Sequence, residues 1–479
     1  MMQESSSVPP PPPVPPVAEP APPRFRAGDA WGPAAIQGLI AAVILLVAAE
    51  IVALILYAVS GSSRPSVLMT SRIGVVIFTL FHHVGMVFDA PNVTISEPAL
   101  GALLPPGAGF SLTVAAALMG GTLAVGAVLY RAGRIVGRAV PGPAWARGLH
   151  GAKIAITYTV VAAVAGLAIH FAVHFPASPR VSGSFSIHPS TIASIIWPLA
   201  LAIGFGFAGG FRAAPPQDEP ETMTRARAVV FGGWRMLLAG LALSFVGLLV
   251  LAAVKPGARP IAYNIPTSSG SDAVGGTVFT VLTVPNRAAL ALFPSMGSCL
   301  GVFANVQGAD VSYCAVSYQH FPSRSALGAI GPALAGGASG IPALPAAPRA
   351  YLLFLLVPAA ATVLGGMAAA RRAKAPDRRV GAAVGALSGV AFALFLLTVG
   401  ILASLSLRFA AHAQVGGISF VFRLGPDLVI GTLLGLAWGV AGGAIGGIIR
   451  PGVPASVPEG GSSFGFEAAP TLPAPPPEP

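Results

Sequence analysis

The chain has 479 residues, of which 54% are apolar and only 9% are charged, and its mean hydropathy is +0.78. A soluble globular domain carries about 25% charged residues, so this composition excludes an ordinary soluble fold and indicates a polytopic membrane protein. The net charge of +11 comes from arginines that are confined to a few loops, which argues against nucleic-acid binding and for a topology signal.

Both ends of the chain are predicted to be disordered, proline-rich tails on the cytoplasmic side. Residues 1–33 contain the tract Pro9–Pro13 and lack the apolar core of a secretory signal peptide. Residues 450–479 have a similar composition. The folded part is therefore expected to begin with the first apolar segment.

Eight apolar segments are long enough to cross a hydrocarbon core of about 30 Å, which takes about 20 helical residues. Because no water reaches the backbone amides in that core, each segment is expected to be a helix. The predicted fold class is thus an all-α polytopic membrane protein with eight transmembrane helices. The segments are 34–59, 110–130, 154–175, 191–211, 236–254, 350–370, 381–407 and 428–449.

The basic residues between these segments predict the orientation. With eight spans, three arginine-rich loops fall on one side, and the positive-inside rule makes that side the cytoplasm. The predicted protein is a multi-pass protein of the cell membrane with both termini in the cytoplasm. The loops contain Arg131, Arg134, Arg138, Arg147 and Lys153; Arg212, Arg225, Arg227 and Arg235; and Arg371, Arg372, Lys374, Arg378 and Arg379.

A shorter apolar segment, 73–88, lies within the outer segment 60–109. Its apolar residues follow helical spacing, but counting it as a ninth span would move every arginine-rich loop outside. We therefore predict an interfacial helix at 73–88, on the outer side of the membrane.

The two halves of the chain share one plan. Residues 34–211 and 235–449 each hold four spans, and 212–234 form a cytoplasmic linker between them. The stretches 182–190 and 419–427 match best, because in both an apolar alternation ends at a proline and Ser190 or Asp427 can cap the next helix. Four is an even number of spans, so the plan predicts two parallel repeats related by an axis along the membrane normal.

The second half carries a larger outer insertion, 255–349. Residues 278–283 and 302–318 favour strands, whereas 328–348, rich in glycine, alanine and proline, favour a stalk. We expect a small β-containing extracytoplasmic module. Its two cysteines, Cys299 and Cys314, flank a hairpin-like stretch, and an oxidising compartment would allow them to form a disulfide; the alternative is two free thiols.

Glycines recur at every fourth residue in the last two spans. Such ridges let helix backbones approach closely in lipid, so they predict tight helix packing, and a homo-oligomer through these glycine-rich helices is a further expectation. The ridges are Gly381, Gly385 and Gly389, and Gly431, Gly435, Gly439, Gly443 and Gly447.

Two sets of polar residues are candidates for a functional site. Glu50 is the acidic residue well inside a span, and a buried ionisable group in a membrane is a functional candidate; it could instead reach water or a polar partner. His170 and His174 are four residues apart and would share a helix face. With His82 and His83 they are candidate ligands for a divalent metal, but no fixed third ligand is evident. The alternative is interfacial histidines bonded to water or carbonyl groups.

The sequence contains no HExxH or GxxxxGK[ST] motif, so it predicts neither a cofactor nor a soluble catalytic domain. The leading hypothesis is a non-catalytic surface protein that senses, binds or assembles with an extracytoplasmic partner. The alternative is a small-solute or ion permease that uses Glu50, and an intramembrane enzyme is the third hypothesis. Apart from the lipid bilayer, the partner is not predicted.

The eight-span layout and stretches such as Gly109-Phe110-Ser111-Leu112-Thr113 resemble the alanine- and glycine-rich multi-pass membrane proteins of actinobacteria, including the uncharacterised group called streptophobe proteins. The resemblance covers most of the membrane part. It implies a similar polytopic fold, and it carries no activity to this chain.

Overall fold

The computed structural model describes residues 30–59, 67–95, 109–175, 181–213, 221–254, 271–306, 309–318, 349–413 and 416–449. Residues 1–29 of the predicted N-terminal tail, the predicted C-terminal tail 450–479 and the predicted stalk 328–348 lie outside these residues. The tail predicted at 1–33 is too long, because α1 already begins at Trp31. Within the described residues, eight helices are long and apolar enough to cross a membrane, which supports a multi-pass membrane protein. Large apolar side chains face outward on these helices; Ile44, for example, is 49% exposed. That exposure suits lipid and not water.

The described residues of the first half form six helices and four strands. The elements are α1 (Trp31–Val59), α2 (Val67–Phe81), β1 (Met86–Ile95), β2 (Gly109–Ala115), α4 (Met119–Arg138), α5 (Ala144–Ala152), α6 (Ile154–Leu167), β3 (Phe171–Phe175), β4 (Val181–Pro189) and α7 (Ala193–Phe211).

The described residues of the second half form five α-helices, one 3-10 helix and four strands. Its elements are α8 (Glu221–Val254), α10 (Ser271–Ser295), β5 (Leu300–Val306), β6 (Ala309–Val316), the 3-10 helix η4 (Arg349–Leu355), α12 (Leu356–Arg372), α13 (Arg378–Ala403), β7 (Leu405–Ala413), β8 (Gly416–Pro426) and α14 (Leu428–Ile449).

The eight helices that can span a membrane differ from the predicted eight in one member. The predicted span 110–130 is wrong at its start, because residues Gly109–Ala115 form strand β2 and the helix α4 begins only at Met119. Arg131, Arg134 and Arg138 consequently lie on α4 and not in a loop, and α4 is not among the eight. Gly276–Ser295 of α10 is among them instead, so the strand predicted at 278–283 is also wrong.

Several other predicted helices are shorter than expected because their ends are strands. The segment 154–175 ends as a helix at Leu167 and continues as β3, and 381–407 ends at Ala403 and continues as β7. The short helix predicted at 73–88 is α2, which ends at Phe81 before strand β1 starts at Met86. The fold is therefore not all-α, and its β structure is not confined to the 255–349 insertion.

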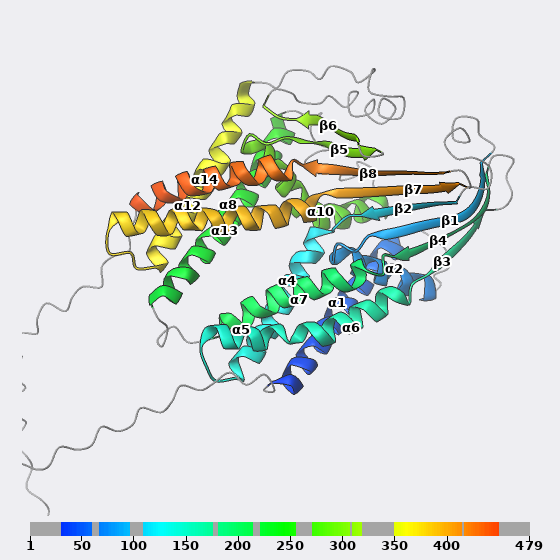
Figure 1. Ribbon diagram of the computed structural model, residues 1–479, viewed down its shortest axis with the longest axis horizontal. Coiled ribbons are helices and arrows are strands. Elements are labelled where there is room, and N and C mark those ends of the chain that lie inside the picture. The colour runs from blue at the N-terminus through cyan, green and yellow to red at the C-terminus, as the bar shows by residue number, and fades with distance from the viewer. Residues whose placement is uncertain are drawn as a thin grey trace, which may run out of the picture.

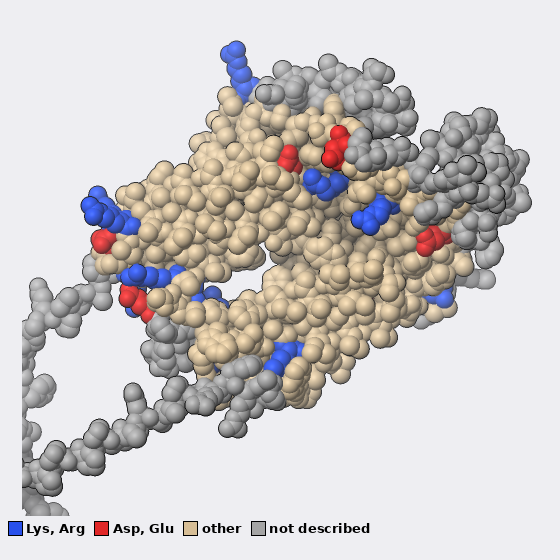
Figure 2. Space-filling view, in the orientation of Figure 1, with Lys and Arg blue, Asp and Glu red and all other residues tan. Residues whose placement is uncertain are grey.

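All eight described strands form one antiparallel sheet. The strand order is β3-β4-β1-β2-β7-β8-β5-β6, so four strands from each half meet at the β2–β7 pair. Figure 1 shows the sheet at one end of the helices, with the α4–α5 and α12–α13 loops at the opposite end. Figure 2 shows basic side chains gathered at that opposite end, beyond a middle region that is almost free of charge on the viewed face.

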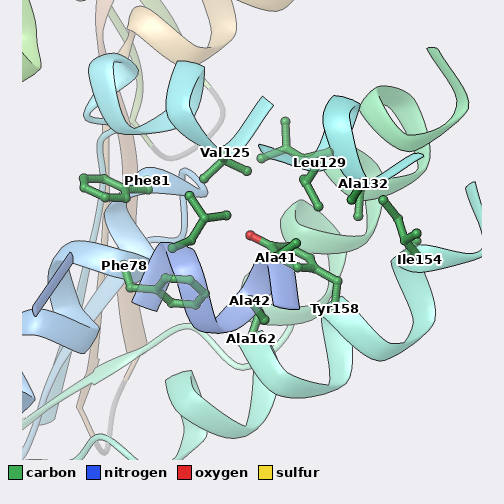
Figure 3. Close-up of a cluster of buried hydrophobic side chains, with 14 of the residues drawn as sticks. Ala41, Ala42, Phe78, Phe81, Val125, Leu129, Ala132, Ile154, Tyr158 and Ala162 are labelled. Carbon is green, nitrogen blue, oxygen red and sulfur yellow. The ribbon is translucent and has the colours of Figure 1, made fainter. Parts of the chain in front are cut away.

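The apolar core is divided between the two halves. One cluster joins α1, α2, α4, α6 and α7, and it buries Phe78, Leu129 and Tyr158 (Figure 3). A second cluster joins α8, α10 and α13 around Phe293 and Phe392, and it also includes Met119 from the start of α4.

Glycines carry the tightest helix contacts, as the sequence predicted. A Cβ at Gly385 of α13 would overlap the carbonyl oxygen of Gly443 of α14, and a Cβ at Gly443 would overlap that of Gly385. Gly446 lies equally close to the backbone of α12 at Val363. These ridges therefore already contact helices of the same chain, and a homo-oligomer built through them stays a prediction.

The Asn286 side chain also bonds the two halves together near the sheet. The Asn286 side-chain oxygen accepts a hydrogen bond from the Met119 amide at 3.0 Å, and its amide nitrogen donates to the Ala117 carbonyl at 2.8 Å. Asn286 of α10 therefore caps the first turn of α4, whose backbone amides have no partner within their own helix.

Candidate functional site

The sheet has two chemically different faces, because successive residues of a strand point to opposite sides. One row of paired residues crosses seven strands and is mostly polar. It runs through His188, Val87, Thr113, Arg408, Val421, Asn305 and Asp310. Figure 2 shows basic and acidic side chains over β5–β8 on the viewed face.

The other face is apolar and aromatic. A continuous row of paired residues crosses six strands through Phe171, Ile187, Phe88, Leu112, Phe409 and Phe420. Phe409 stacks on Phe420 with ring centroids 4.8 Å apart and on Phe110 at 5.9 Å. These stacks span β2, β7 and β8, so they tie the two halves of the sheet together.

A pocket of about 310 Å³ opens on the polar face. Strands β5, β6, β7 and β8 supply its walls, all from the second half of the chain. Its polar lining is Asn305, Asp310, Ser312, Ser406 and Arg423, and its apolar lining is Phe303, Ala304, Val311 and Val421.

Arg423 is held firmly in this pocket. Its guanidinium lies 4.5 Å from the Phe303 ring centroid and donates a hydrogen bond to the Pro426 carbonyl at 2.7 Å. Partial burial lowers the pKa of Arg423, and the carboxylate of Asp427 opposes that effect. A guanidinium remains charged in proteins, so the pocket presents a positioned cation.

The acidic member of the pocket is also oriented. The Asn305 side-chain amide donates a hydrogen bond to Asp310 at 2.7 Å. Ser312 lies opposite Phe303, and Ser406 lies opposite Arg423, so both hydroxyl-bearing residues are on the same face of the sheet. The pocket thus combines a cation, a carboxylate and hydroxyl groups around one aromatic ring.

The predicted histidine candidates do not converge on one site. His82 lies in the turn after α2; its Nδ1 donates to the Phe78 carbonyl at 2.7 Å, and its Nε2 accepts a hydrogen bond from the Tyr158 hydroxyl. His83 packs edge-on against Trp197 with ring centroids 5.0 Å apart. Both turn residues lie outside the eight spans, and burial lowers the pKa of each to about 4. They are therefore neutral at pH 7.

His170 and His174 are not on a helix, which corrects the predicted shared helix face. His170 precedes β3 and His174 lies within it. The His170 ring stacks on His188 at 5.8 Å, and His188 Nε2 lies 3.0 Å from an Asp89 carboxylate oxygen. Among the residues that the structure describes, no group of three or more His, Cys, Asp or Glu side chains is arranged to hold a metal ion.

Glu50 lies on α1 where this helix packs against α2. Its carboxylate accepts a hydrogen bond from the Ser71 hydroxyl at 3.2 Å, and it occupies the space above Gly74, where a Cβ would overlap it. The carboxylate therefore has a polar partner and a fitted place between two helices, which is a structural role that the sequence alone left open.

Cys299 and Cys314 form a disulfide, with Cα atoms 5.7 Å apart. The bond joins the residue before β5 to β6, next to the Arg423 pocket. The sequence predicts that these two cysteines can lie together, but it does not predict the pocket. The available signal was Arg423, a lone charged residue within the apolar alternation Phe420, Phe422 and Leu424.

Comparisons with known proteins give no further guide: no family model, no curated protein and no solved structure matches the chain. The resemblance to streptophobe proteins therefore stays a prediction.

Proposed function

We propose that this protein is a non-catalytic binding or assembly protein of the cell membrane whose eight-stranded sheet recognises a partner outside the cytoplasm. The observation that carries the proposal is the pocket around Arg423, which lies on the polar face of a sheet built by both halves of the chain. The helices would anchor and orient this sheet.

The proposed orientation places the sheet outside and both termini in the cytoplasm. Two features support it. The arginine-bearing ends of α4 and α12 lie opposite the sheet, as the positive-inside rule requires for cytoplasmic loops. In this orientation α4 crosses the membrane although its arginines keep it out of the eight most apolar helices. The sheet also carries the Cys299–Cys314 disulfide, and disulfides persist in oxidising compartments.

We further propose that the two halves are parallel repeats. Matching turns support this proposal. The Ser190 amide donates to the Gly85 carbonyl at 2.7 Å, and the Asp427 amide donates to the Cys299 carbonyl at 2.9 Å. Each bond ties the residue after the last strand of its half to the turn between a helix and a strand.

Strand registers support the same correspondence. Met86 of β1 pairs with Pro189 of β4, and Leu300 of β5 pairs with Pro426 of β8. In each half the strand that follows the second helix therefore pairs with the strand that precedes the last helix. The first residue of the one lies opposite the final proline of the other. The strand orders β3-β4-β1-β2 and β7-β8-β5-β6 are alike.

The Arg423 side of the pocket suits an anionic group on the partner, while the Asp310 carboxylate on the β6 side is bonded to Asn305. Guanidinium groups recognise carboxylates and phosphates through paired hydrogen bonds, and the ring of Phe303 holds Arg423 in place. Ser312 and Ser406 can donate further hydrogen bonds to anionic oxygens.

Thermal unfolding of the full chain in lipid nanodiscs tests this proposal, with inorganic phosphate and a short glutamate peptide as separate probes. We expect at least one probe to raise the unfolding temperature of the wild type and to have no effect on Arg423→Gln. Arg408→Gln, which removes an exposed arginine from the same face outside the pocket, should keep the response.

Two outcomes would count against the proposal. One is the absence of a response to either probe in the wild type. The other is an equal response in Arg423→Gln, which would assign anion binding to other residues. A response to phosphate alone or to the peptide alone would identify which anionic group the pocket prefers.

The alternative function is a small-solute or ion permease. One observation supports a permease: the Glu50 carboxylate lies between two helices, where it accepts a hydrogen bond from Ser71. Flux into reconstituted vesicles that disappears in Glu50→Gln would support this alternative, whereas unchanged flux in that variant would remove it.

A further inference from the structure

The described sheet ends in two strands that each pair on one side. β6 pairs with β5 and β3 pairs with β4, and these two strands are the first and last in the order of the described sheet. A strand paired on one side presents a row of backbone donors and acceptors that can accept another strand.

Neither strand contains proline or lysine, two of the features that usually prevent such pairing, although β3 has only 5 residues and the β5–β6 pair has one register shift. β6 reads ADVSYCAV and β3 reads FAVHF. Edge strands commonly carry proline or lysine, which block or discourage association. Asp310 is the one charged residue in the two strands.

The chain already contains the contact that these edges would make. β2 is the last strand in the order of the first half, β7 is the first in the order of the second half, and the two pair antiparallel. If the halves are repeats, β6 corresponds to β2 and β3 corresponds to β7. A β6–β3 pair would therefore repeat the β2–β7 junction.

We propose that β6 of one chain pairs with β3 of a second copy, which extends the sheet from one molecule to the next in the plane of the membrane. The inference rests on the repeat proposed above. The contact joins two different edges, so it is heterologous, and repeated copies would form a ring or an open row.

The β2–β7 junction also sets the register of the proposed contact. Its pairs include Ala115 with Ser406 and Thr113 with Arg408. In the proposed contact, β6 takes the place of β2 and β3 takes the place of β7. Ser317, just after β6, then lies opposite Ala172, and Cys314 lies opposite His174.

Cross-linking between two differently tagged full-length chains tests the contact. One chain carries Ser317→Cys and the other carries Ala172→Cys, and both are expressed together in membranes and oxidised. We expect a covalent dimer that carries both tags. Ser317→Cys expressed with Val421→Cys, which lies on the central strand β8, should give none.

A single chain that carries both Ser317→Cys and Ala172→Cys provides a second measurement. A cross-link only within this monomer would mean that the sheet closes on itself, and no cross-link in either arrangement would mean that the edges have other occupants. Either result overturns the proposal. Arg423→Gln in the same chains separates this test from the binding proposal, because it should leave the cross-link intact.

Discussion

His83 and Gly297 occupy the same position in two turns of the molecule, and both have a positive backbone φ, 59° and 98°. Each residue ends the turn between a helix and a strand, α2 to β1 and α10 to β5. The following amide closes both turns by bonding the carbonyl five residues earlier, Val84 to Thr79 at 3.2 Å and Ser298 to Phe293 at 3.1 Å. Glycine adopts this conformation without strain, whereas a histidine there is uncommon.

The turn at Gly297 should be sensitive to backbone strain. A Cβ there would have room, since the nearest atom would be a Leu434 methyl carbon at 3.8 Å. Gly297→Ala should therefore lower the free energy of unfolding by about 1–2 kcal/mol through the left-handed conformation alone. Gly297→Asn should cost less, since asparagine tolerates this conformation. Thermal unfolding in detergent measures both variants, and equal loss in the two would contradict a backbone origin.

Mild acid should destabilise the turn that contains His82 and His83. Burial lowers the folded-state pKa of each to about 4, below the unfolded value of about 6.5. The two neutral histidines therefore contribute fully to the free energy of unfolding above about pH 6.5. This contribution is lost as the pH falls toward about 4. His83→Asn, which suits the positive φ, should reduce this pH dependence. Chemical unfolding at several pH values measures this dependence. If the free energy of unfolding of His83→Asn falls between about pH 6.5 and about pH 4 as steeply as that of the wild type, His83 is not one of the groups responsible.

Close packing of α13 on α14 should make Gly443 intolerant of side chains. Gly443→Ala would push its Cβ into the Gly385 carbonyl, and we expect a loss of about 1–3 kcal/mol, as for other overpacked sites. Gly204→Ala is the matched control, because nothing lies within 4 Å of a Cβ there. Chemical unfolding in detergent should separate the two variants; similar stability of both would show that the helices can move apart freely.

Loss of the disulfide should loosen the second half of the sheet. Cys299 and Cys314 are 15 residues apart in the sequence, and closing a loop of this length contributes about 3 kcal/mol. The double variant Cys299→Ser with Cys314→Ser should unfold at a lower temperature than the wild type, and reduction of the wild type should reproduce the shift. An identical unfolding temperature in all three samples would show that the strands need no covalent support.

The membrane helices could be predicted largely from the sequence because their apolar length is a strong signal. The strands were missed where they continue an apolar segment. Phe110, Leu112 and Val114 alternate with Ser111 and Thr113, which is a strand pattern. Because an apolar segment follows directly, these residues were predicted to be the start of a transmembrane helix. Residues 171–175 were likewise predicted to be the end of the helix that precedes them.

The Arg423 pocket depends on pairing that the sequence does not report. Phe303 and Arg423 become neighbours only because β5 pairs with β8, and strand partners far apart in a chain leave no local pattern. The disulfide was easier to predict, because Cys299 and Cys314 lie close together in one segment and are the two cysteines of the chain.

Labelling with a membrane-impermeant maleimide tests the central claim most directly, that the sheet lies outside and the arginine-bearing helix ends lie in the cytoplasm. Single cysteines at Ser312→Cys on β6 and at Arg378→Cys at the start of α13 are introduced with Cys299 and Cys314 replaced by serine. The account predicts labelling of Ser312→Cys in intact cells and of Arg378→Cys only after lysis. Labelling of Arg378→Cys in intact cells, with Ser312→Cys protected, would contradict it.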